Sequence, residues 1–276
     1  MGKAAQLVAE LGFDGLDINM GCPDRAVEKQ GGGAANMKDQ KNALKVLEAA
    51  REGVAEATSK KQKGKKSPIP VTVKTRIGYN KVDLGWIKLL LEQGLPALTV
   101  HLRTRKEMSA VPAHWELMPE IVKMRDHIQA HIPTDHRTLI IGNGDVSSLN
   151  EAAAKVKQYG CDGIMIGRGI FGTPWFFEKL HEIQDSRLEI LESKILNLDS
   201  RGRTPEERLK IMLEHARLFD KAFCGTKHVK NFAVMKKHFK AYVSGWDGAK
   251  ELRAELMETT DFKEVKRVID AYLKKI

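Results

Sequence analysis

Residues 12–37 read GFDGLDINMGCPDRAVEKQGGGAANM and carry the clearest fold signal in the chain. The run LDINM at 16–20 predicts a short buried strand that ends at the turn Gly21-Cys22-Pro23. A glycine-rich loop follows at 31–34, where the backbone is free to approach a ligand. Parallel β/α barrels place polar side chains at the C-terminal ends of their strands. Asn19 and Cys22 are therefore candidate site residues, although an isolated cysteine is more often a small buried apolar residue.

Strand and helix patterns alternate outward from this stretch. Predicted strands cover 16–20, 71–76, 98–102, 139–143 and 163–167. Predicted helices cover 2–11, 39–58, 83–93, 115–130 and a segment starting at the capping box 148–151, and a short helix is predicted to open at Thr173-Pro174. Apolar strands that alternate with helices predict an α/β fold with a parallel sheet covered on both faces. A complete barrel of this type has about eight strands in about 250 residues. We therefore expect a TIM-type barrel represented by its last five strands only, without the first three.

The composition changes near residue 197. The segment Thr204-Pro205-Glu206-Glu207 is a second capping box, and the pattern from there to residue 276 is helical throughout. We predict a partial barrel over 1–197 and a small all-helical domain over 203–276, joined by a linker around 198–202.

The helical tail contains a basic segment at 227–240, KHVKNFAVMKKHFK, with five lysines, two histidines and no acidic residue. Its apolar residues recur at helical spacing and are predicted to form a core: Phe232, Met235 and Phe239. The opposite face then carries a stripe of lysines: Lys230, Lys236, Lys237 and Lys240. Such a stripe is either a solvated helix face or a groove for an RNA backbone.

Composition narrows the function classes. The net charge of +10 suits a polyanionic partner, although many basic proteins bind none. Three cysteines without regular spacing predict neither a disulfide framework nor a zinc site, so we expect no metal and a reducing compartment. No apolar run approaches the roughly 20 residues that span a bilayer, so no membrane partner is expected.

Polar side chains follow four of the predicted strands, at ends that converge on one mouth in a barrel. They are Asn19 and Cys22, Lys74 and Arg76, His101 and Arg103, and Asn143 with Asp145. Two turns rich in glycine, Gly142-Asn143-Gly144-Asp145 and Gly167-Arg168-Gly169, follow the last two strands, where barrels bind phosphate groups. Tight turns without a ligand are the alternative interpretation of these two segments.

These motifs resemble one family. D-I-N-M-G-C-P followed by G-G-G-A resembles the signature of the tRNA-dihydrouridine synthases, flavin enzymes that reduce uridine in tRNA. The same family is resembled, in order, by V-K-T-R-I-G, T-V-H-L-R-T-R, I-I-G-N-G-D-V, D-G-I-M-I-G-R-G-I-F-G-T-P-W-F-F and K-K-H-F-K-A-Y. A family P-M-A segment on the first strand and a Gln on the third have no counterpart here. Leu102 replaces a smaller family residue and is expected to narrow the mouth.

The resemblance implies a cytoplasmic flavoprotein oxidoreductase of tRNA processing that uses FMN, with NADPH as reductant and tRNA as partner. The oligomeric state stays open, with a monomer expected. It implies that Cys22 protonates uracil C5 while hydride reaches C6. The residues that it implies for FMN are Asn19, Lys74, His101, Asn143, Gly144, Asp145, Gly167 and Arg168. Those expected to contact RNA are Arg103, Lys230, Lys236, Lys237 and Lys240. The alternatives are a noncatalytic tRNA-binding fragment and another FMN barrel oxidoreductase that acts on a small molecule.

Overall fold

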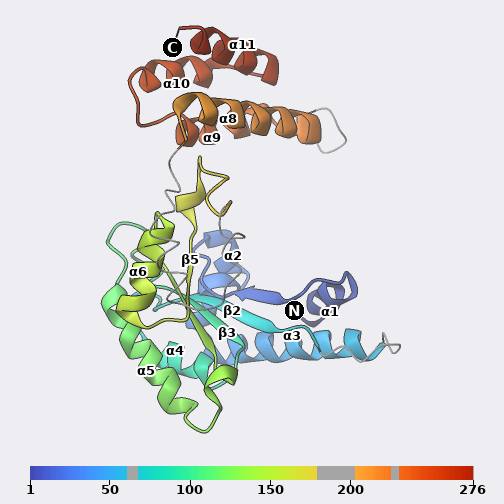
Figure 1. Cartoon of the computed structure of the whole chain (residues 1–276). Coiled ribbons are helices and arrows are strands. Elements are labelled where there is room, and N and C mark those ends of the chain that lie inside the picture. The colour runs from blue at the N-terminus through green and yellow to red at the C-terminus, as the bar shows by residue number, and fades with distance from the viewer. Residues whose placement is uncertain (61–67, 179–202, 225–229, 276) are drawn as a thin grey trace. The chain divides into compact units, whose positions relative to one another are not determined.

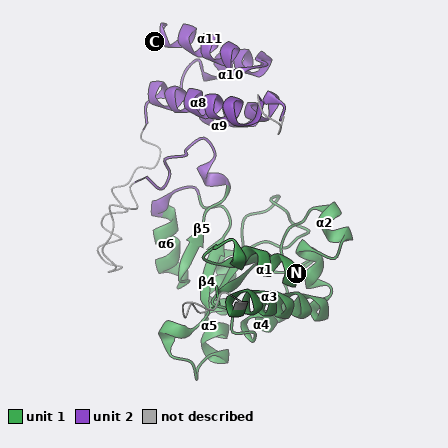
Figure 2. Ribbon diagram, turned by 90° about the vertical axis from the view of Figure 1, so that its right-hand side faces the viewer, with its two compact units in different colours: residues 1–146, 151–167 green, residues 147–150, 168–276 purple. Residues whose placement is uncertain are grey.

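The structure is a computed structural model that describes residues 1–60, 68–178, 203–224 and 230–275. The chain divides into two compact units, 1–146 with 151–167, and 147–150 with 168–276 (Figure 2). The predicted domain boundary at 197 and the linker at 198–202 lie outside the described residues, so the predicted domain limits stay a prediction.

The first unit is built on one parallel sheet whose strands follow each other in sequence order (Figure 1). The strands are β1 (Leu16–Asn19), β2 (Val71–Arg76), β3 (Ala97–His101), β4 (Leu139–Asn143) and β5 (Gly163–Met165). Every neighbouring pair is parallel. The predicted α/β class is confirmed, and five successive parallel strands with helices are what a partial TIM barrel contains. Over the described residues β1 and β5 form the two edges of this sheet.

Helices connect the strands, as the alternating pattern predicts. They are α1 (Gly2–Glu10), α2 (Arg25–Lys29), α3 (Gln40–Lys60), α4 (Leu84–Leu91), α5 (Met118–Ile128) and α6 (Leu149–Tyr159). The long helix α3 packs along α1 (Figures 1 and 2). Side chains of Asp24 and Asp83 accept backbone N–H bonds at the starts of α2 and α4, which satisfies donors that a helix leaves open.

Two predicted helices differ in detail. The helix expected over 115–130 begins as a 3-10 turn at Trp115–Leu117 before α5 starts. The short helix expected to open at Thr173-Pro174 is a run of turns over the described residues 173–178. There the N–H groups of Phe176 and Glu178 bond to carbonyls three residues back, which is turn geometry.

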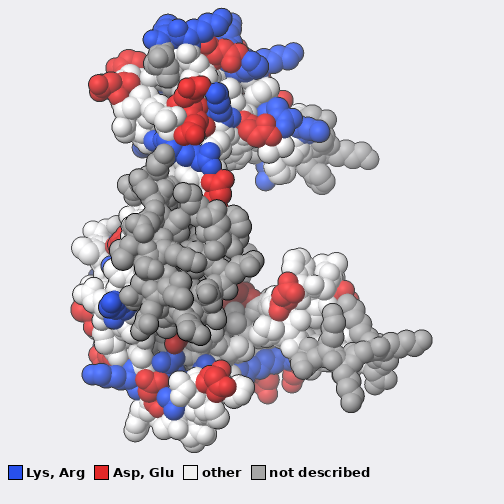
Figure 3. Space-filling model, in the orientation of Figure 1, with Lys and Arg blue, Asp and Glu red and all other residues white. Residues whose placement is uncertain are grey.

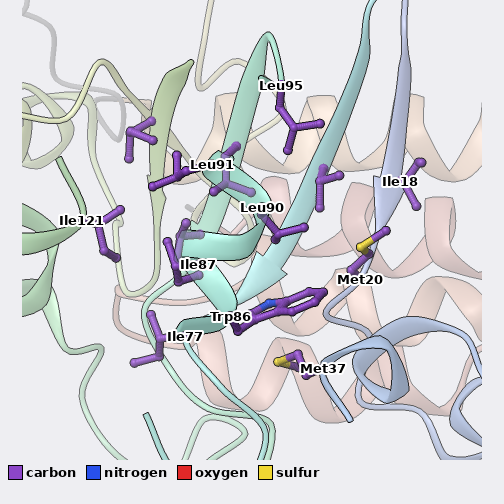
Figure 4. Packing of buried hydrophobic residues seen from close by; sticks show 14 of the residues in the cluster. Ile18, Met20, Met37, Ile77, Trp86, Ile87, Leu90, Leu91, Leu95 and Ile121 are labelled. Carbon is purple, nitrogen blue, oxygen red and sulfur yellow. The ribbon is translucent and has the colours of Figure 1, made fainter. Parts of the chain in front are cut away.

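The core of the first unit lies where α3, α4 and α5 meet the sheet (Figure 4). Trp86 of α4 is fully buried, and its indole Nε1 donates to Thr75 Oγ1 of β2 at 2.8 Å. That bond satisfies a polar group that would otherwise be costly to bury. Leu102 is also fully buried in this core, and its predicted narrowing of the mouth stays a prediction.

The second unit is helical, as predicted. Its helices are α8 (Pro205–Phe219), α9 (Lys236–Tyr242), α10 (Ala249–Glu258) and α11 (Phe262–Leu273). The predicted capping box is confirmed, because Thr204 Oγ1 accepts from Glu207 N at 3.2 Å and Glu207 Oε2 accepts from Thr204 N at 2.9 Å. The predicted core residues are also confirmed: Phe232, Met235 and Phe239 are buried.

Candidate functional site

Strand register brings the candidate side chains of the first unit to one edge of the sheet. Asn19 pairs with Lys74, Arg76 pairs with His101, and His101 pairs with Asn143. Each of these residues ends its strand or lies within two residues of its end. The predicted gathering of polar groups at the C-terminal ends of β1 to β4 is therefore present.

Polar side chains of β1 and β2 hold the turn that follows β1. Asn19 Oδ1 accepts from the N–H of Gly21 at 3.0 Å, so the asparagine amide braces this turn. The buried guanidinium of Arg76 donates from Nε to the Gly21 carbonyl at 3.0 Å. Gly21 has little room of its own, because an added Cβ would lie 3.0 Å from the Thr75 carbonyl carbon. The end of β2 thus fixes the backbone that leads into Cys22.

The glycine-rich loop packs directly against Cys22, whose side chain is half-buried. The N–H of Ala34 donates to the Cys22 carbonyl at 2.9 Å. Gly33 has φ +55°, and an added Cβ would lie 2.6 Å from the Cys22 carbonyl oxygen. Only glycine combines this backbone conformation with that approach. The glycines therefore position the cysteine turn here, a role that the sequence pattern alone did not distinguish from ligand approach.

Lys74 and His101 supply an amine and an imidazole beside this turn. Burial, followed by the nearby Arg76 charge, lowers the pKa of Lys74, although Asp17 and Cys22 act in the opposite direction. Over the described residues, no hydrogen bond or ion pair engages the Lys74 amine. Burial is also the main reason that the pKa of His101 falls to about 3, with further lowering from neighbouring cations. The imidazole is therefore neutral at neutral pH and has one donor and one acceptor nitrogen.

The turn after β4 is held from two sides. The Asn143 amide Nδ2 donates to the Met165 carbonyl of β5 at 2.8 Å. The Gly144 carbonyl accepts from Trp115 Nε1 at 2.9 Å, and Gly144 has φ +135°, a conformation that glycine favours. Both residues thus fix the position of the turn, and their predicted FMN contact stays a prediction.

Arg103 and Asp145 form an ion pair that sequence reasoning missed. Arg103 Nη2 lies 2.5 Å from Asp145 Oδ2, which also accepts from the N–H of Ala113 at 2.9 Å. Arg103 Nε donates to the Val111 carbonyl at 2.6 Å, and only 4% of the arginine side chain is exposed. Such a buried, engaged guanidinium is placed to brace the β3 and β4 loops. Its predicted RNA contact and the predicted FMN contact of Asp145 stay predictions.

The turn after β5 divides between the two units. Gly167 ends the first unit, and an added Cβ there would meet open space. Arg168 begins a 3-10 turn (Arg168–Ile170) that belongs to the second unit. The predicted phosphate role of these two residues stays a prediction.

A cluster next to the Cys22 turn was not predicted. Glu28 of α2 accepts from the Tyr79 hydroxyl at 2.5 Å and from Arg105 Nε at 2.5 Å. The ammonium of Lys38 lies 4.5 Å from the centre of the Tyr79 ring. A glutamate six residues after the cysteine is the only sequence signal, and its partners follow other strands.

The predicted basic face of the second unit is present in part. Lys230, Lys237 and Lys240 are exposed and Lys236 is half-buried, while Phe239 beneath them is buried. Lys230 Nζ lies 5.0 Å from the centre of the Phe223 ring. Figure 3 shows acidic and basic side chains interspersed on the face of this unit that it presents. The RNA contact of these lysines stays a prediction.

The described residues also bear on metal binding and membrane insertion. Over those residues, no group of three or more His, Cys, Asp or Glu side chains is placed to hold a metal ion. No described helix has both the length and the apolar character needed to cross a membrane.

Comparison with known proteins points to one family. The family model described as dihydrouridine synthase (Dus) matches residues 1–276. A "Probable tRNA-dihydrouridine synthase" of Staphylococcus epidermidis is 35% identical over 267 residues, which cover 96% of this chain and 69% of that protein. The "Probable tRNA-dihydrouridine synthase 2" of Bacillus subtilis (strain 168) is 37% identical over 270 residues, or 97% of this chain and 70% of that protein. The chain belongs to the dihydrouridine synthase family.

Proposed function

We propose that this chain reduces uridine in tRNA to 5,6-dihydrouridine, with FMN as bound cofactor and NADPH as reductant. Membership of the family supports an oxidoreductase. The observation that carries the proposal is the meeting of a thiol, a half-buried amine and a neutral imidazole at one edge of the sheet. They belong to Cys22, Lys74 and His101.

The donor set fits an acceptor-rich ring such as a flavin. The Lys74 amine is half-buried and, over the described residues, not engaged by another side chain, so it is available to a ring carbonyl or nitrogen. His101 remains neutral because its pKa is about 3, so it donates a hydrogen bond without adding charge. We propose that these two residues hold the ring with Asn19, and that Asn143, Gly144, Asp145, Gly167 and Arg168 hold the phosphate end. Bound FMN would supply the hydride for uracil C6.

The Cys22 thiol is the proposed proton donor. Saturating the C5–C6 double bond requires a hydride at C6 and a proton at C5. Bonds from Asn19, Arg76 and Ala34 hold the turn that carries Cys22. Its Sγ is therefore kept in one place, and a positioned acid replaces solvent as the proton donor. The thiol gives up its proton to C5 and is left as a thiolate, which takes a proton from solvent before the next turnover.

The substrate side of the proposal concerns RNA. A uracil base reaches such a site only when it leaves the tRNA stack. We propose that residues 203–276 form the tRNA-binding domain and that Lys230, Lys236, Lys237 and Lys240 contact its phosphates, which makes binding salt-dependent. Because tRNA is the proposed substrate, we also propose that the protein acts in the cytoplasm, as a monomer.

Replacement of the cysteine tests the proposal. Cys22→Ala is expected to retain flavin, as read from the visible absorbance of the purified protein. Dihydrouridine formation is expected to fall about 10²- to 10⁴-fold, the usual contribution of a positioned acid. Cys224→Ala, at a half-exposed cysteine of the second unit, is the control and should keep full activity. Unchanged turnover of Cys22→Ala would refute the acid role.

The same preparations separate the two alternatives. A noncatalytic tRNA-binding protein would bind tRNA but show no flavin absorbance. An FMN oxidoreductase of small molecules would show the absorbance and consume NADPH without dependence on the lysines of the second unit. Neither alternative explains why the cysteine turn is braced so closely.

A further inference from the structure

The strongest unassigned feature of the first unit is the cluster around Glu28. Its carboxylate accepts one hydrogen bond at each oxygen, from the Tyr79 hydroxyl and from Arg105 Nε, both at 2.5 Å. Only 9% of the Glu28 side chain is exposed. The three residues lie on α2, on the loop after β2 and on the loop after β3. The cluster therefore joins a helix and two loops at the C-terminal edge of the sheet.

Arg105 also has a second contact, and this one is to the cysteine turn itself. Its Nη2 donates to the Pro23 carbonyl at 3.3 Å. With the bonds described above, the three consecutive carbonyls of Gly21, Cys22 and Pro23 each accept one hydrogen bond. Their donors are Arg76 Nε, the N–H of Ala34 and Arg105 Nη2, which come from three different parts of the chain. A backbone held at three successive peptides has little freedom to shift its side chain.

The charges of Glu28 and Arg105 stabilise the hydrogen bonds of the cluster at neutral pH. Burial alone would raise the pKa of Glu28, but the bonds from Tyr79 and Arg105 outweigh it, so the pKa lies below its usual value. The bond to Glu28 in turn raises the pKa of Arg105. Carboxylate and guanidinium are thus both ionised, and their charge-assisted bond is of the stronger kind.

We propose that Arg105, oriented by Glu28 and Tyr79, is a positioning residue that holds the Cys22 turn in place for proton transfer. This inference rests on the proposed function, because it assumes that Cys22 is the proton donor. Arg105 acts through the Pro23 carbonyl and does not itself touch substrate. Glu28 and Tyr79 act through Arg105, since they fix the orientation of its guanidinium.

The kinetic test uses Arg105→Ala, Glu28→Ala and Tyr79→Phe in the full chain. Displacing a reacting group by about 1 Å can cost about a hundredfold in rate. We expect kcat for dihydrouridine formation to fall between about tenfold and about a hundredfold in the two alanine variants, and less in Tyr79→Phe. KM for tRNA should stay unchanged. The double variant Glu28→Ala/Arg105→Ala should lose no more than the worse single variant, because the residues act as a unit.

The matched control is Arg137→Ala. Arg137 resembles Arg105 in its contacts: Nε donates to the Ile132 carbonyl at 3.0 Å, and Nη1 lies 3.3 Å from Asp126 Oδ1. Its side chain is 19% exposed, against 23% for Arg105. It lies just before β4, at the opposite end of the strands from the site. A similar loss of folding stability without a loss of kcat is expected for this control.

A second readout does not depend on activity. The rate at which iodoacetamide alkylates Cys22 is followed by peptide mass spectrometry in the native protein. Release of the turn should raise this rate in both Arg105→Ala and Glu28→Ala. These two variants change the local charge in opposite directions. A shared increase therefore reports movement of the turn, whereas opposite changes would report thiol electrostatics and overturn the proposal.

The outcomes separate the two levels of inference. If Cys22→Ala abolishes turnover while Arg105→Ala and Glu28→Ala keep wild-type kcat and alkylation rates, the positioning role is wrong and the proposed function stands. If Cys22→Ala has no effect, the acid role itself fails. Equal loss of kcat in Arg105→Ala and the Arg137→Ala control would mean that the cluster contributes only to overall stability, and it would also overturn the proposal.

Discussion

The central and edge strands of the sheet are built differently. In β2 four of six residues are buried, and in β3 three of five are buried. In β1 only Ile18 is buried, and no residue of β5 is. Apolar packing therefore holds the middle of the sheet. At the β1 edge, hydrogen bonds from neighbouring elements hold the tip of the strand, which leads into Cys22.

This difference sorts the candidate site into two chemical environments. Lys74 lies two residues before the end of β2 and His101 ends β3, and burial is the main cause of their lowered pKa values. Cys22 follows the edge strand and is half-buried, so its placement depends on braces rather than on packing. The site therefore combines Lys74 and His101, whose pKa values are lowered by burial, with Cys22, whose position is set by hydrogen bonds to its turn.

The largest expected effect tests the packed centre. Trp86 is fully buried and bonds to Thr75 of β2, so Trp86→Ala removes a large core side chain and leaves a buried hydroxyl without its donor. We expect the free energy of unfolding to fall by about 3–5 kcal/mol. The matched variant Phe13→Ala, at a side chain 57% exposed next to the edge strand, should change it by no more than about 0.5 kcal/mol. Urea unfolding followed by circular dichroism measures both.

Equal losses in the two variants would contradict the division between a packed centre and a braced edge. Loss of flavin in Trp86→Ala without loss of stability would place the indole at the cofactor instead of in the core.

The sequence predicted those parts of this comparison that depend on local pattern. Alternation located the five strands, and the Thr204 capping box and the spacing of Phe232, Met235 and Phe239 located the second unit. Strand ends also identified where polar groups gather, because parallel strands bring equivalent positions to one edge.

What the sequence did not predict are the contacts between loops. Arg103 and Asp145 are 42 residues apart, and Glu28 and Arg105 are 77 residues apart. Nothing in local periodicity selects these partners, since each arginine could equally face solvent or a phosphate. The prediction that Arg103 contacts RNA gave no sign that its guanidinium also pairs with Asp145 and donates to the Val111 carbonyl. Side-chain pairing across loops depends on register, which only the assembled sheet supplies.

A smaller effect tests the braced edge. Gly33 and Gly31 both have positive φ, at +55° and +77°. Only at Gly33 would an added Cβ collide with the Cys22 carbonyl, because the space around Gly31 is open. Gly31→Ala should cost about 1–2 kcal/mol, the penalty for a left-handed backbone. Gly33→Ala should cost about 1–3 kcal/mol more through overpacking.

Unfolding in urea measures the stability of both glycine variants, and Cys22 alkylation reports the local change. If the two variants lose equal stability and alkylate at equal rates, the glycine-rich loop does not hold the cysteine turn, and the edge is not braced as described.

The last expected effect appears only at acidic pH, and it contrasts a histidine on a central strand with one on a loop. Burial and nearby cations lower the pKa of His101 to about 3 in the folded state, well below its ordinary value of 6.5. Below pH 6.5 the unfolded chain therefore binds a proton that the folded chain does not, and His101 costs stability progressively down to about pH 3. In urea unfolding between pH 7 and pH 4, wild type should lose stability relative to His101→Gln.

His114 should show the opposite sign. Its bond to Glu107, and a further bond to Glu116, raise its pKa above the ordinary value although burial opposes them. Its contribution to stability is fully present below pH 6.5 and is lost as pH rises through the raised value. Wild type should therefore exceed His114→Gln most at acidic pH. Carboxylates shared by wild type and variant cancel in each difference. A flat difference for His101→Gln would therefore mean that the end of β3 is hydrated, and the contrast between packed centre and braced edge would fail at this residue of the proposed site.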